Sequence, residues 1–374
     1  MSIHVDGNQL KNGSGAVVQL RGGNLMGMEY TAVGGWSPSN PFPQVVSSTW
    51  AALKSWGINV VRIPLNQSSW FNASCVNGSS VMDPDPGDNY KSTLKSTVDR
   101  ATSEGLYVIL DLHWSAPKDA ASTVSGVSTQ CAMNQNVMAD ADGSIQFWTE
   151  VATAYKSYPN VMFELFNEPY LTQWTLTGTE AQAWAALRDG TTIDSYVPRY
   201  ATGRFWQSAG YQAMLNAVRA TGATNIVLTS GMDWAGQLQY WYTYRPIDPI
   251  GQLAAAWHAY PTYGAAWGTA AYQLPKWGEN AYTWAQGILN NNIPVIVTEF
   301  GDRNTTGTVG APFASHLLPR LDTMGISYLG WTFTPADLTD NQLIKDNNGT
   351  PTDGYGVYVK AHYLCRAAGT TTCP

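Results

Sequence analysis

Apolar residues gather into eight short runs along the chain, and most of these runs are separated by segments with helical periodicity. Each run is almost continuously apolar. A strand with one solvated face would alternate apolar and polar residues, so these runs are typical of parallel strands covered on both faces. The runs are VVQLRGGNL at 17–25, INVVRIPL at 58–65, LYVILDLHW at 106–114, VMFELFNEP at 161–169, NIVLTSG at 225–231, LAAAWHAYP at 253–261, IPVIVTEFG at 293–301 and ISYLGWTF at 326–333.

Six of the intervening segments show helical periodicity. The one at 145–158 ends before Pro159, and the one at 205–221 ends at Gly222, as helices commonly do. The segment 232–251 has no clean helical pattern, and its structure stays open. The six expected helices are Gln44–Trp56, Tyr90–Glu104, Ile145–Tyr158, Phe205–Thr221, Tyr282–Leu289 and Phe313–Met324.

Eight strand–helix alternations predict an α/β fold of the (β/α)8 barrel type. A doubly wound open sheet competes, but RGGNLMG after the first run lacks the G-x-G-x-x-G spacing of a phosphate loop. A bare barrel needs roughly 250 residues, so long βα loops are expected at 66–90, 115–143 and 170–203. We predict one catalytic domain over 1–374: an N-terminal hairpin at 1–16 covering the barrel bottom, and the barrel at 17–374.

Composition and charge argue against several partners. Only 13% of the residues are charged, the formal net charge is −7 and no basic block occurs, so nucleic acid is not expected. No apolar run approaches a membrane span, and we expect a monomer. The 16 Trp and 20 Tyr mostly belong to the core, but flat aromatic faces also suit a protein that grips sugar rings.

The four cysteines permit three disulfide connectivities, and four free thiols are a further option. One arrangement joins Cys365 to Cys373 in a small C-terminal loop and Cys75 to Cys131 across two long loops. With the low charge and the many small polar residues, such disulfides suggest export. The chain begins without a charged and apolar leader, so secretion implies a removed signal peptide that Met1 replaces.

Polar residues stand at or near the ends of six apolar runs, where a barrel places its active face. A single buried histidine is more often a satisfied core group than a ligand, but six such positions favour a functional site. These residues are Arg62, His113, Asn167 with Glu168, His258 with Tyr260, Glu299, and Trp331.

The residue types at these positions indicate acid/base chemistry. Glu168 and Glu299 follow runs that lie across the barrel, and two carboxyl groups about 5–5.5 Å apart fit retaining glycoside hydrolysis. One carboxyl must stay protonated to give its proton to the leaving oxygen, and the other must stay ionised to attack. Arg62 beside a carboxylate would hold it ionised, and Tyr260 would donate a further hydrogen bond.

In this order the motifs resemble glycoside hydrolase family 5, the cellulase and mannanase family of retaining (β/α)8 enzymes. The resemblance rests on the Arg of VVRIPL, the His of LDLHW, and FNEP, WHAYP, TEFG and GWTF. It implies that Glu168 is the general acid/base and Glu299 the nucleophile, with no metal or organic cofactor. The implied supporting residues are Asn167 for the sugar 2-hydroxyl, Arg62 and Tyr260 for the nucleophile, His113 and His258 lining the pocket, and Trp331 as the sugar platform.

The resemblance implies an endo-β-1,4-glucanase acting on a β-linked polysaccharide or oligosaccharide. Another β-glycan such as mannan or xyloglucan, or exo action, is the alternative, and a non-catalytic carbohydrate-binding barrel is disfavoured because both glutamates are present. Trp36 and Trp234 are candidates for further sugar platforms. The acidic stretches DPDPGDN at 83–89 and DADG at 140–143 could bind calcium, but ordinary turns are favoured.

Overall fold

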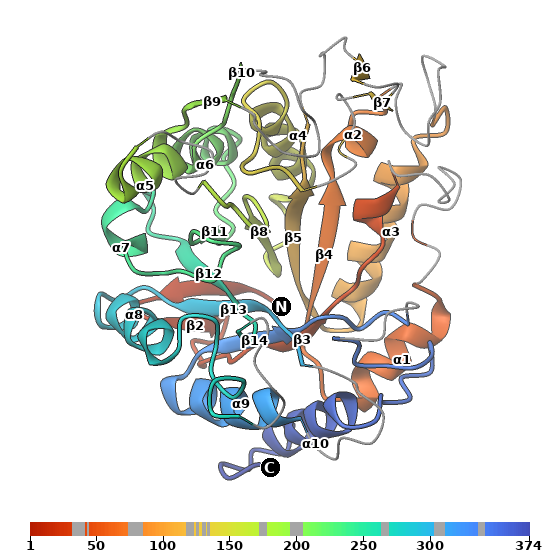
Figure 1. The fold of residues 1–374 in the computed structure, drawn as a ribbon. Helices are drawn as coiled ribbons and strands as arrows, with labels where there is room; N and C mark the ends of the chain where they lie inside the picture. Colours follow the sequence, from red (N-terminus) through yellow and green to blue (C-terminus); the bar gives the residue numbers. More distant parts are fainter. Residues whose placement is uncertain are drawn as a thin grey trace.

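Eight parallel strands close into a barrel at the centre of the molecule (Figure 1). They follow one another in chain order, and the first pairs with the last, so the predicted (β/α)8 fold is confirmed. The strands are β3 (Arg21–Asn24), β4 (Val60–Asn66), β5 (Tyr107–Trp114), β8 (Val161–Glu164), β11 (Val227–Ser230), β12 (Leu253–Ala259), β13 (Val295–Phe300) and β14 (Ser327–Gly330). The computed structural model describes residues 1–31, 42, 45–73, 85–116, 123–124, 127–128, 132, 135–171, 178–194, 205–262, 269–302, 311–335 and 341–374.

Both faces of the barrel strands are buried, which explains their continuously apolar sequences. Side chains along a strand alternate between its two faces. On β4, Val60 belongs to the apolar cluster inside the barrel, and Val61 packs in the layer between strands and helices. Ile109 and Leu110 of β5 divide in the same way. Each apolar run therefore contributes side chains to two apolar clusters, one inside the barrel and one between the strands and the helices.

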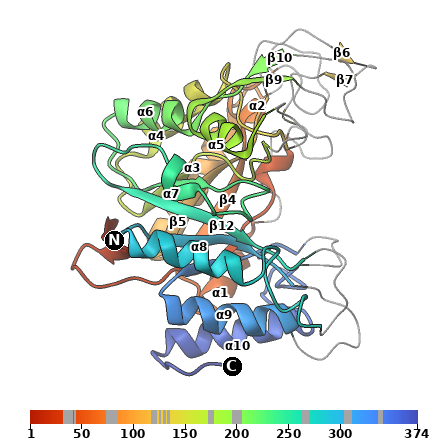
Figure 2. The same cartoon turned by 60° about the vertical axis from the view of Figure 1, so that its left-hand side comes forward.

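Helices cover the outside of the barrel, and Figure 2 shows α8, α9 and α10 stacked beside it. The helices are α1 (Ser47–Ser55), α2 (Gln67–Trp70), α3 (Asn89–Ser103), α4 (Ser144–Tyr155), α5 (Glu180–Asp189), α6 (Tyr211–Ala220), α7 (Trp241–Tyr244), α8 (Glu279–Asn290), α9 (Pro312–Met324) and α10 (Tyr355–Ala367), with the 3-10 helix η1 (Met28–Tyr30). Each of the six predicted helices is present, with shifted ends. The sequence patterns did not reveal α2, α5, α7 or α10.

The helix predicted from Phe205 is wrong at its start. Residues Phe205–Gln207 form the short strand β10, which pairs antiparallel with β9 (Thr192–Asp194). A Cβ at Gly210 would lie 2.3 Å from the carbonyl oxygen of Arg188, so only glycine fits where the chain passes from β10 into α6. The expected long loops hold α2, the two-residue strands β6 (Thr123–Val124) and β7 (Val127–Ser128), and α5 with β9.

The N-terminal hairpin closes the bottom of the barrel, as predicted. Its strands β1 (Ile3–Asp6) and β2 (Gln9–Asn12) pair antiparallel. Leu10 joins the apolar cluster inside the barrel. The Val5 N–H donates to Oε1 of Gln252 at 2.8 Å, which ties the hairpin to the residue before β12.

A disulfide joins Cys365, in the last turn of α10, to Cys373 beyond the helix, which confirms that part of the predicted pairing. Cys75 and Cys131 lie outside the described residues. Among the described helices, none has both the length and the apolar character needed to cross a bilayer. The single-domain division stays a prediction.

Candidate active site

A layer of polar side chains lies inside the barrel, directly above the apolar cluster. Side chains two residues apart on a strand point the same way, so Asp111 follows the interior Ile109 and Glu164 follows the interior Met162. Layered filling of this kind is usual in such barrels, but the side chains are usually apolar. We call this set the polar layer; its buried members are Asn24, Arg62, Asp111, Glu164, Ser230, His258 and Thr298.

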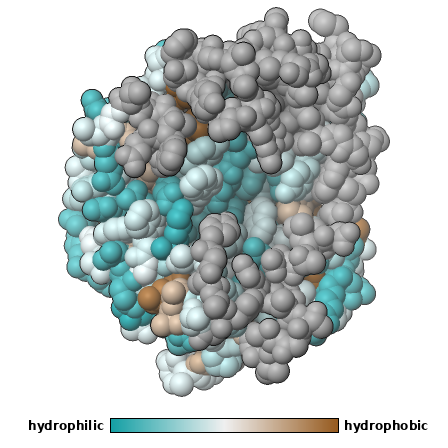
Figure 3. Space-filling model, viewed as in Figure 1, coloured by the Kyte–Doolittle hydropathy of each residue, from teal (hydrophilic) through white to brown (hydrophobic). Residues whose placement is uncertain are grey.

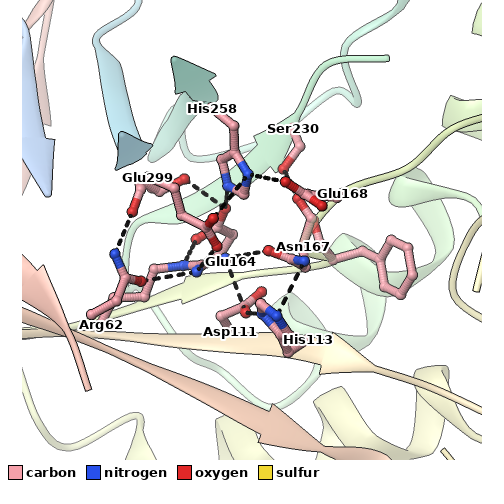
Figure 4. A network of polar contacts seen from close by, with 12 residues as sticks. Arg62, Asp111, His113, Glu164, Asn167, Glu168, Ser230, His258 and Glu299 are labelled. Atoms are coloured by element: carbon pink, nitrogen blue, oxygen red, sulfur yellow. Dashed lines mark hydrogen bonds and ion pairs between the residues drawn. The ribbon is translucent and has the colours of Figure 1, made fainter. Parts of the chain in front are cut away.

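Arg62 is the centre of the polar layer and is fully buried (Figure 4). The prediction that it ends its strand is wrong, because β4 continues to Asn66 and leaves Arg62 inside the barrel. Its Nε donates to Oε2 of Glu164 at 2.7 Å, its Nη1 donates to Oε1 of Glu299 at 2.6 Å, and its Nη2 lies 3.0 Å from Oδ2 of Asp111. Burial opposes the positive charge, but the three carboxylates together raise the pKa of Arg62.

Glu299 reaches this centre through an irregularity in β13. Ala256 of β12 pairs with Ile296, but His258 pairs with Glu299, so the register shifts by one residue between them. A bulge of this kind re-aims side chains and is common beside active sites. It lets two consecutive residues, Thr298 and Glu299, both contact members of the polar layer.

Both carboxylate oxygens of Glu299 accept hydrogen bonds. Oε1 receives Nη1 of Arg62 at 2.6 Å, and Oε2 receives the hydroxyl of Tyr260 at 2.9 Å. Burial and the neighbouring Glu299 raise the pKa of Tyr260, so its hydroxyl remains a donor. The two donors fix the position of the Glu299 carboxyl group at the cleft, as a nucleophile requires.

Glu168 and Glu299 both approach Nδ1 of His258. The Glu168 side chain is 18% exposed, and its burial raises the pKa of the carboxyl, as an acid requires. Nδ1 of His258 lies 2.8 Å from Oε1 of Glu168 and 3.5 Å from Oε2 of Glu299. One oxygen of Glu168 lies within 4.8 Å of one oxygen of Glu299, close to the separation of a retaining glycosidase.

Asn167, His113 and Trp331 form the adjoining wall. Oδ1 of Asn167 accepts from Nη2 of Arg62 at 2.8 Å, and its Nδ2 lies 3.4 Å from Nε2 of His113. Nδ1 of His113 lies 2.7 Å from Oδ2 of Asp111. The His113 ring stacks on Trp331, with centroids 5.7 Å apart. Burial lowers the pKa of His113 to about 4, so the ring is neutral at pH 7.

A cleft of about 580 Å³ opens above these residues. Figure 3 shows hydrophilic residues across the hollowed middle of this face. Trp234 is 44% exposed on the cleft wall and stacks on Tyr170 with centroids 4.9 Å apart. Nζ of Lys276 lies 4.9 Å from its ring centroid and 2.8 Å from a carboxylate oxygen of Asp233. Trp36, the other predicted platform, lies outside the described residues.

The turn that carries Trp234 has an unusual backbone. Asp233, Trp234 and Ala235 have consecutive φ angles of 57°, 56° and 58°, a left-handed conformation that side chains with a Cβ rarely adopt. The Trp234 N–H donates to the carbonyl of Pro169 at 3.0 Å, which fixes the turn beside Glu168. Strained backbone of this kind tends to cluster at ligand-binding sites.

The structure brings together the predicted residues that it describes, and it adds residues that the sequence analysis missed. Those residues are Asn24, Asp111, Glu164, Ser230 and Thr298 of the polar layer, together with Lys276 and Asp233 on the cleft wall. A signal was present for two of them, since Asp111 and Glu164 are charged residues inside otherwise apolar runs. A charge buried in a core normally requires a partner, and both partner Arg62.

Two possible metal sites bear on the expectation that no metal is needed. Among the described residues, Glu168, His258 and Glu299 could together hold an ion, but an ion there would occupy the oxygen that must attack. Asp140, in the second acidic stretch, accepts hydrogen bonds from the backbone of Gly143 at 2.7 Å and from Gln67 at 2.8 Å. The Gly143 contact is that of an ordinary turn, and the Gln67 contact ties the turn to α2. Asp83 lies outside the described residues.

Comparison with known proteins gives a family. The model of the cellulase family, glycosyl hydrolase family 5, matches residues 11–337. Endoglucanase MaCel5A of Microbulbifer sp. is 22% identical over 89% of this chain and 51% of its own length. Cellulase CelDZ1 of Thermoanaerobacterium sp. is 23% identical over 94% of this chain and 75% of its own. The chain spans about half the length of several curated relatives it matches.

Solved structures share the barrel. The β-glucanase SdGluc5_26A of Saccharophagus degradans, in complex with cellotetraose, superposes with a TM-score of 0.66 at 21% identity, covering 98% of this chain and 94% of that one. Cellulase Cel5C_n gives a TM-score of 0.61 at 19% identity, covering 97% and 91%. At identities of 21% and 19%, the similarity to these structures supports a shared fold alone.

Proposed function

Because the chain belongs to glycosyl hydrolase family 5, we propose that it is a retaining endo-β-1,4-glucanase that works by double displacement. The observation that carries the proposal is the pair of carboxyl groups at the cleft floor, with oxygens of Glu168 and Glu299 within 4.8 Å of each other. Inverting enzymes hold their carboxyls about 6.5–9.5 Å apart to admit a water molecule between them.

In the first step, an oxygen of Glu299 attacks the anomeric carbon of the bound sugar. The bond to the leaving oxygen breaks, and that oxygen takes the electron pair and the proton of Glu168. Arg62 and Tyr260 each donate a hydrogen bond to Glu299 and hold its carboxyl group in position. Trp331 beside His113 offers an aromatic face for the reacting sugar, and the amide of Asn167 is placed to bond its 2-hydroxyl.

In the second step, the ionised Glu168 takes a proton from a water molecule. The water oxygen attacks the anomeric carbon, and the ester bond to Glu299 breaks and restores its carboxylate. Two inversions at one carbon give net retention. The residues supply the acid, the base and the nucleophile, so no cofactor enters the steps.

The substrate class is supported by the names of the relatives, since MaCel5A is an endoglucanase and SdGluc5_26A a β-glucanase seen with cellotetraose. The open cleft with Trp234 exposed on its wall suits a polymer. Mannan, xyloglucan or exo action remains the alternative. We also propose export, which the disulfide between Cys365 and Cys373 favours because such bonds persist in oxidising compartments.

The first test is reducing-sugar release from a polysaccharide panel. It comprises carboxymethyl-cellulose, mixed-linkage β-glucan, glucomannan, galactomannan, xyloglucan and xylan, and the blank is the double variant Glu168→Ala, Glu299→Ala. We expect release from the glucans with a rapid fall in viscosity, and an initial product of β configuration by NMR. Activity confined to mannan or xyloglucan would change the assigned substrate and leave the proposed mechanism unchanged. An α-configured initial product would overturn the mechanism.

A further inference from the structure

Glu164 is a buried carboxyl group in contact with the site, and none of the steps above uses it. It is the last residue of β8 and its side chain is fully buried. Oε2 accepts from Nε of Arg62 at 2.7 Å, and Oε1 accepts from the hydroxyl of Thr298 at 2.9 Å. Burial raises the pKa of Glu164, and the charge of Arg62 opposes that shift.

The ring of His258 stands between Glu164 and Glu168 (Figure 4). Nδ1 lies 2.8 Å from Oε1 of Glu168, and Nε2 lies 3.9 Å from Oε1 of Glu164. Within the described part of the chain, Nε2 has no hydrogen-bond partner, although it is buried. Burial lowers the pKa of His258 to about 4, so at neutral pH the ring carries one proton, on one of its two nitrogens.

We propose that Glu164 is a positioning residue that keeps the ring proton of His258 on Nε2, and thereby keeps Glu168 in its acid form. A carboxylate near Nε2 attracts a proton to that nitrogen. Nδ1 then presents a lone pair to Glu168, and a contact of 2.8 Å to a lone pair is favourable only if Glu168 carries the hydrogen. This inference rests on the proposed acid/base role of Glu168.

The same ring form serves both chemical steps. In the first step the O–H bond of Glu168 breaks as the leaving oxygen takes the proton, and His258 neither gains nor loses one. The resulting Glu168 carboxylate faces the Nδ1 lone pair, which destabilises it and makes it a stronger base. In the second step it regains a proton from water. With the opposite tautomer, an N–H at Nδ1 would stabilise the carboxylate. Less of Glu168 would then carry a proton before the first step, and its carboxylate would be a weaker base in the second.

Other charged groups also act on His258 and Glu168, and they contribute to the pH dependence of both wild type and variant. Arg62 and His113 face it from β4 and β5, and Glu299 faces it from β13. The charged or titratable neighbours found among the described residues are Arg62, Asp111, His113, Glu164, Tyr260, Lys276 and Glu299. Among the described residues, the carboxylate recorded beside Nε2 is that of Glu164, with Oε1 at 3.9 Å.

The test compares wild type with Glu164→Gln, which removes the charge and keeps the shape. We expect the alkaline limb of kcat/KM to move to lower pH by roughly one unit, since a nearby negative charge shifts a pKa by about 1–3 units. At pH 7, kcat/KM on a β-glucan should fall about 10-fold, within the range of general acid catalysis. On 2,4-dinitrophenyl β-cellobioside, whose leaving group needs no proton, it should fall less than about 3-fold.

Asp322→Asn is the matched control. Asp322 faces Nε2 of His362 at 3.0 Å, outside the site, so the variant also neutralises a carboxylate beside a histidine. We expect both limbs of the pH profile to stay in place. If Glu164 had only a structural role, Glu164→Gln would lower kcat/KM equally on both substrates and would leave the alkaline limb in place. That result would overturn the inference.

Nitrogen-15 NMR of the histidine rings tests the wild-type protein directly, even if Glu164→Gln does not fold. The chain has five histidines, and a His258→Gln sample identifies the signal. A proton on Nε2 supports the inference, and a proton on Nδ1 overturns it. Failure of the proposed function looks different, because then wild type would hydrolyse neither glucan nor aryl glycoside while the ring form could still be read.

Discussion

At the scale of single residues, the site is a balance of one buried cation against several buried carboxyl groups. Arg62 contacts Asp111, Glu164 and Glu299, and burial raises the pKa of Asp111 to about 7 despite that cation. Glu299 accepts hydrogen bonds from Arg62 and Tyr260, whereas burial raises the pKa of the Glu168 carboxyl and favours its protonated form. Environment therefore assigns opposite roles to two chemically identical side chains.

The nucleophile assignment is tested by Glu299→Gln. The variant keeps the shape of the side chain and removes the attacking charge, so we expect kcat to fall by at least about 10³-fold with an unchanged circular dichroism spectrum. Glu299→Ala with added azide should recover part of the turnover and give a glycosyl azide of inverted configuration. Near wild-type activity of Glu299→Gln would rule out the mechanism.

Glu29 in η1 links the site region to the pH dependence of stability. It is fully buried, and burial raises its pKa from 4.5 to about 8. Between these values the folded chain holds a proton that the unfolded chain has lost, so the free energy of unfolding falls as pH rises from about 4.5 to 8. Burial raises the pKa of Asp111 to about 7, so Asp111 also lowers the free energy of unfolding as the pH rises toward 7.

Glu29→Gln should remove part of this pH dependence. Glutamine resembles the protonated acid, so the variant should be more stable than wild type at pH 8 by a few kcal/mol, at about 1.4 kcal/mol per unit of pKa. At pH 4.5 the two should be similar. Urea unfolding at both pH values measures the difference, and equal slopes of stability against pH in the two proteins would contradict this origin.

At the scale of elements, the sequence predicted strands well because each barrel strand is buried on both faces. The continuous runs at 106–114 and 253–261 carry that burial in their composition. The bulge in β13 has no such signature, because pairing register depends on the neighbouring strand. The prediction that Arg62 ends its strand failed for the same reason. How far β4 continues past Arg62 depends on pairing with neighbouring strands, which the local sequence does not show.

The site was predicted to the extent that its residues occur in recognisable motifs. Glu168 and Glu299 stand in FNEP and TEFG, and their roles follow from their type. Glu164 precedes FNEP and reads as part of an apolar strand until its partner Arg62 is known. The turn at Asp233–Ala235 was left open, because three consecutive left-handed residues without glycine follow no propensity rule.

The hairpin at the barrel bottom contributes stability and lies away from the chemistry. Leu10 is 4% exposed, so Leu10→Ala should lower the free energy of unfolding by about 2–4 kcal/mol and leave kcat unchanged at a temperature where the protein stays folded. Lys11→Ala is the control, because its ion pair with Asp6 lies at the surface, where such pairs contribute little to stability. Equal losses in the two variants would contradict this role for the hairpin.

At the scale of the whole molecule, the net charge of −7 and the neutral substrate proposed here make a joint prediction. A neutral glucan gains nothing from long-range electrostatic attraction, so kcat/KM should change less than about 2-fold between 20 and 500 mM NaCl, a range over which screening changes greatly. Initial rates on mixed-linkage β-glucan measure this. A steep fall with salt would point to a charged glycan and against the proposed substrate.

Closure of the barrel also has a consequence for synthesis on the ribosome. Val5 bonds to Gln252, and β3 takes β14 as one of its two neighbours, so the earliest segments find their partners only when most of the chain has emerged. Contacts this distant in sequence slow folding. The nascent chain would therefore carry unpaired strand edges for most of translation, a period in which a chaperone that shields apolar segments would raise the yield of active enzyme.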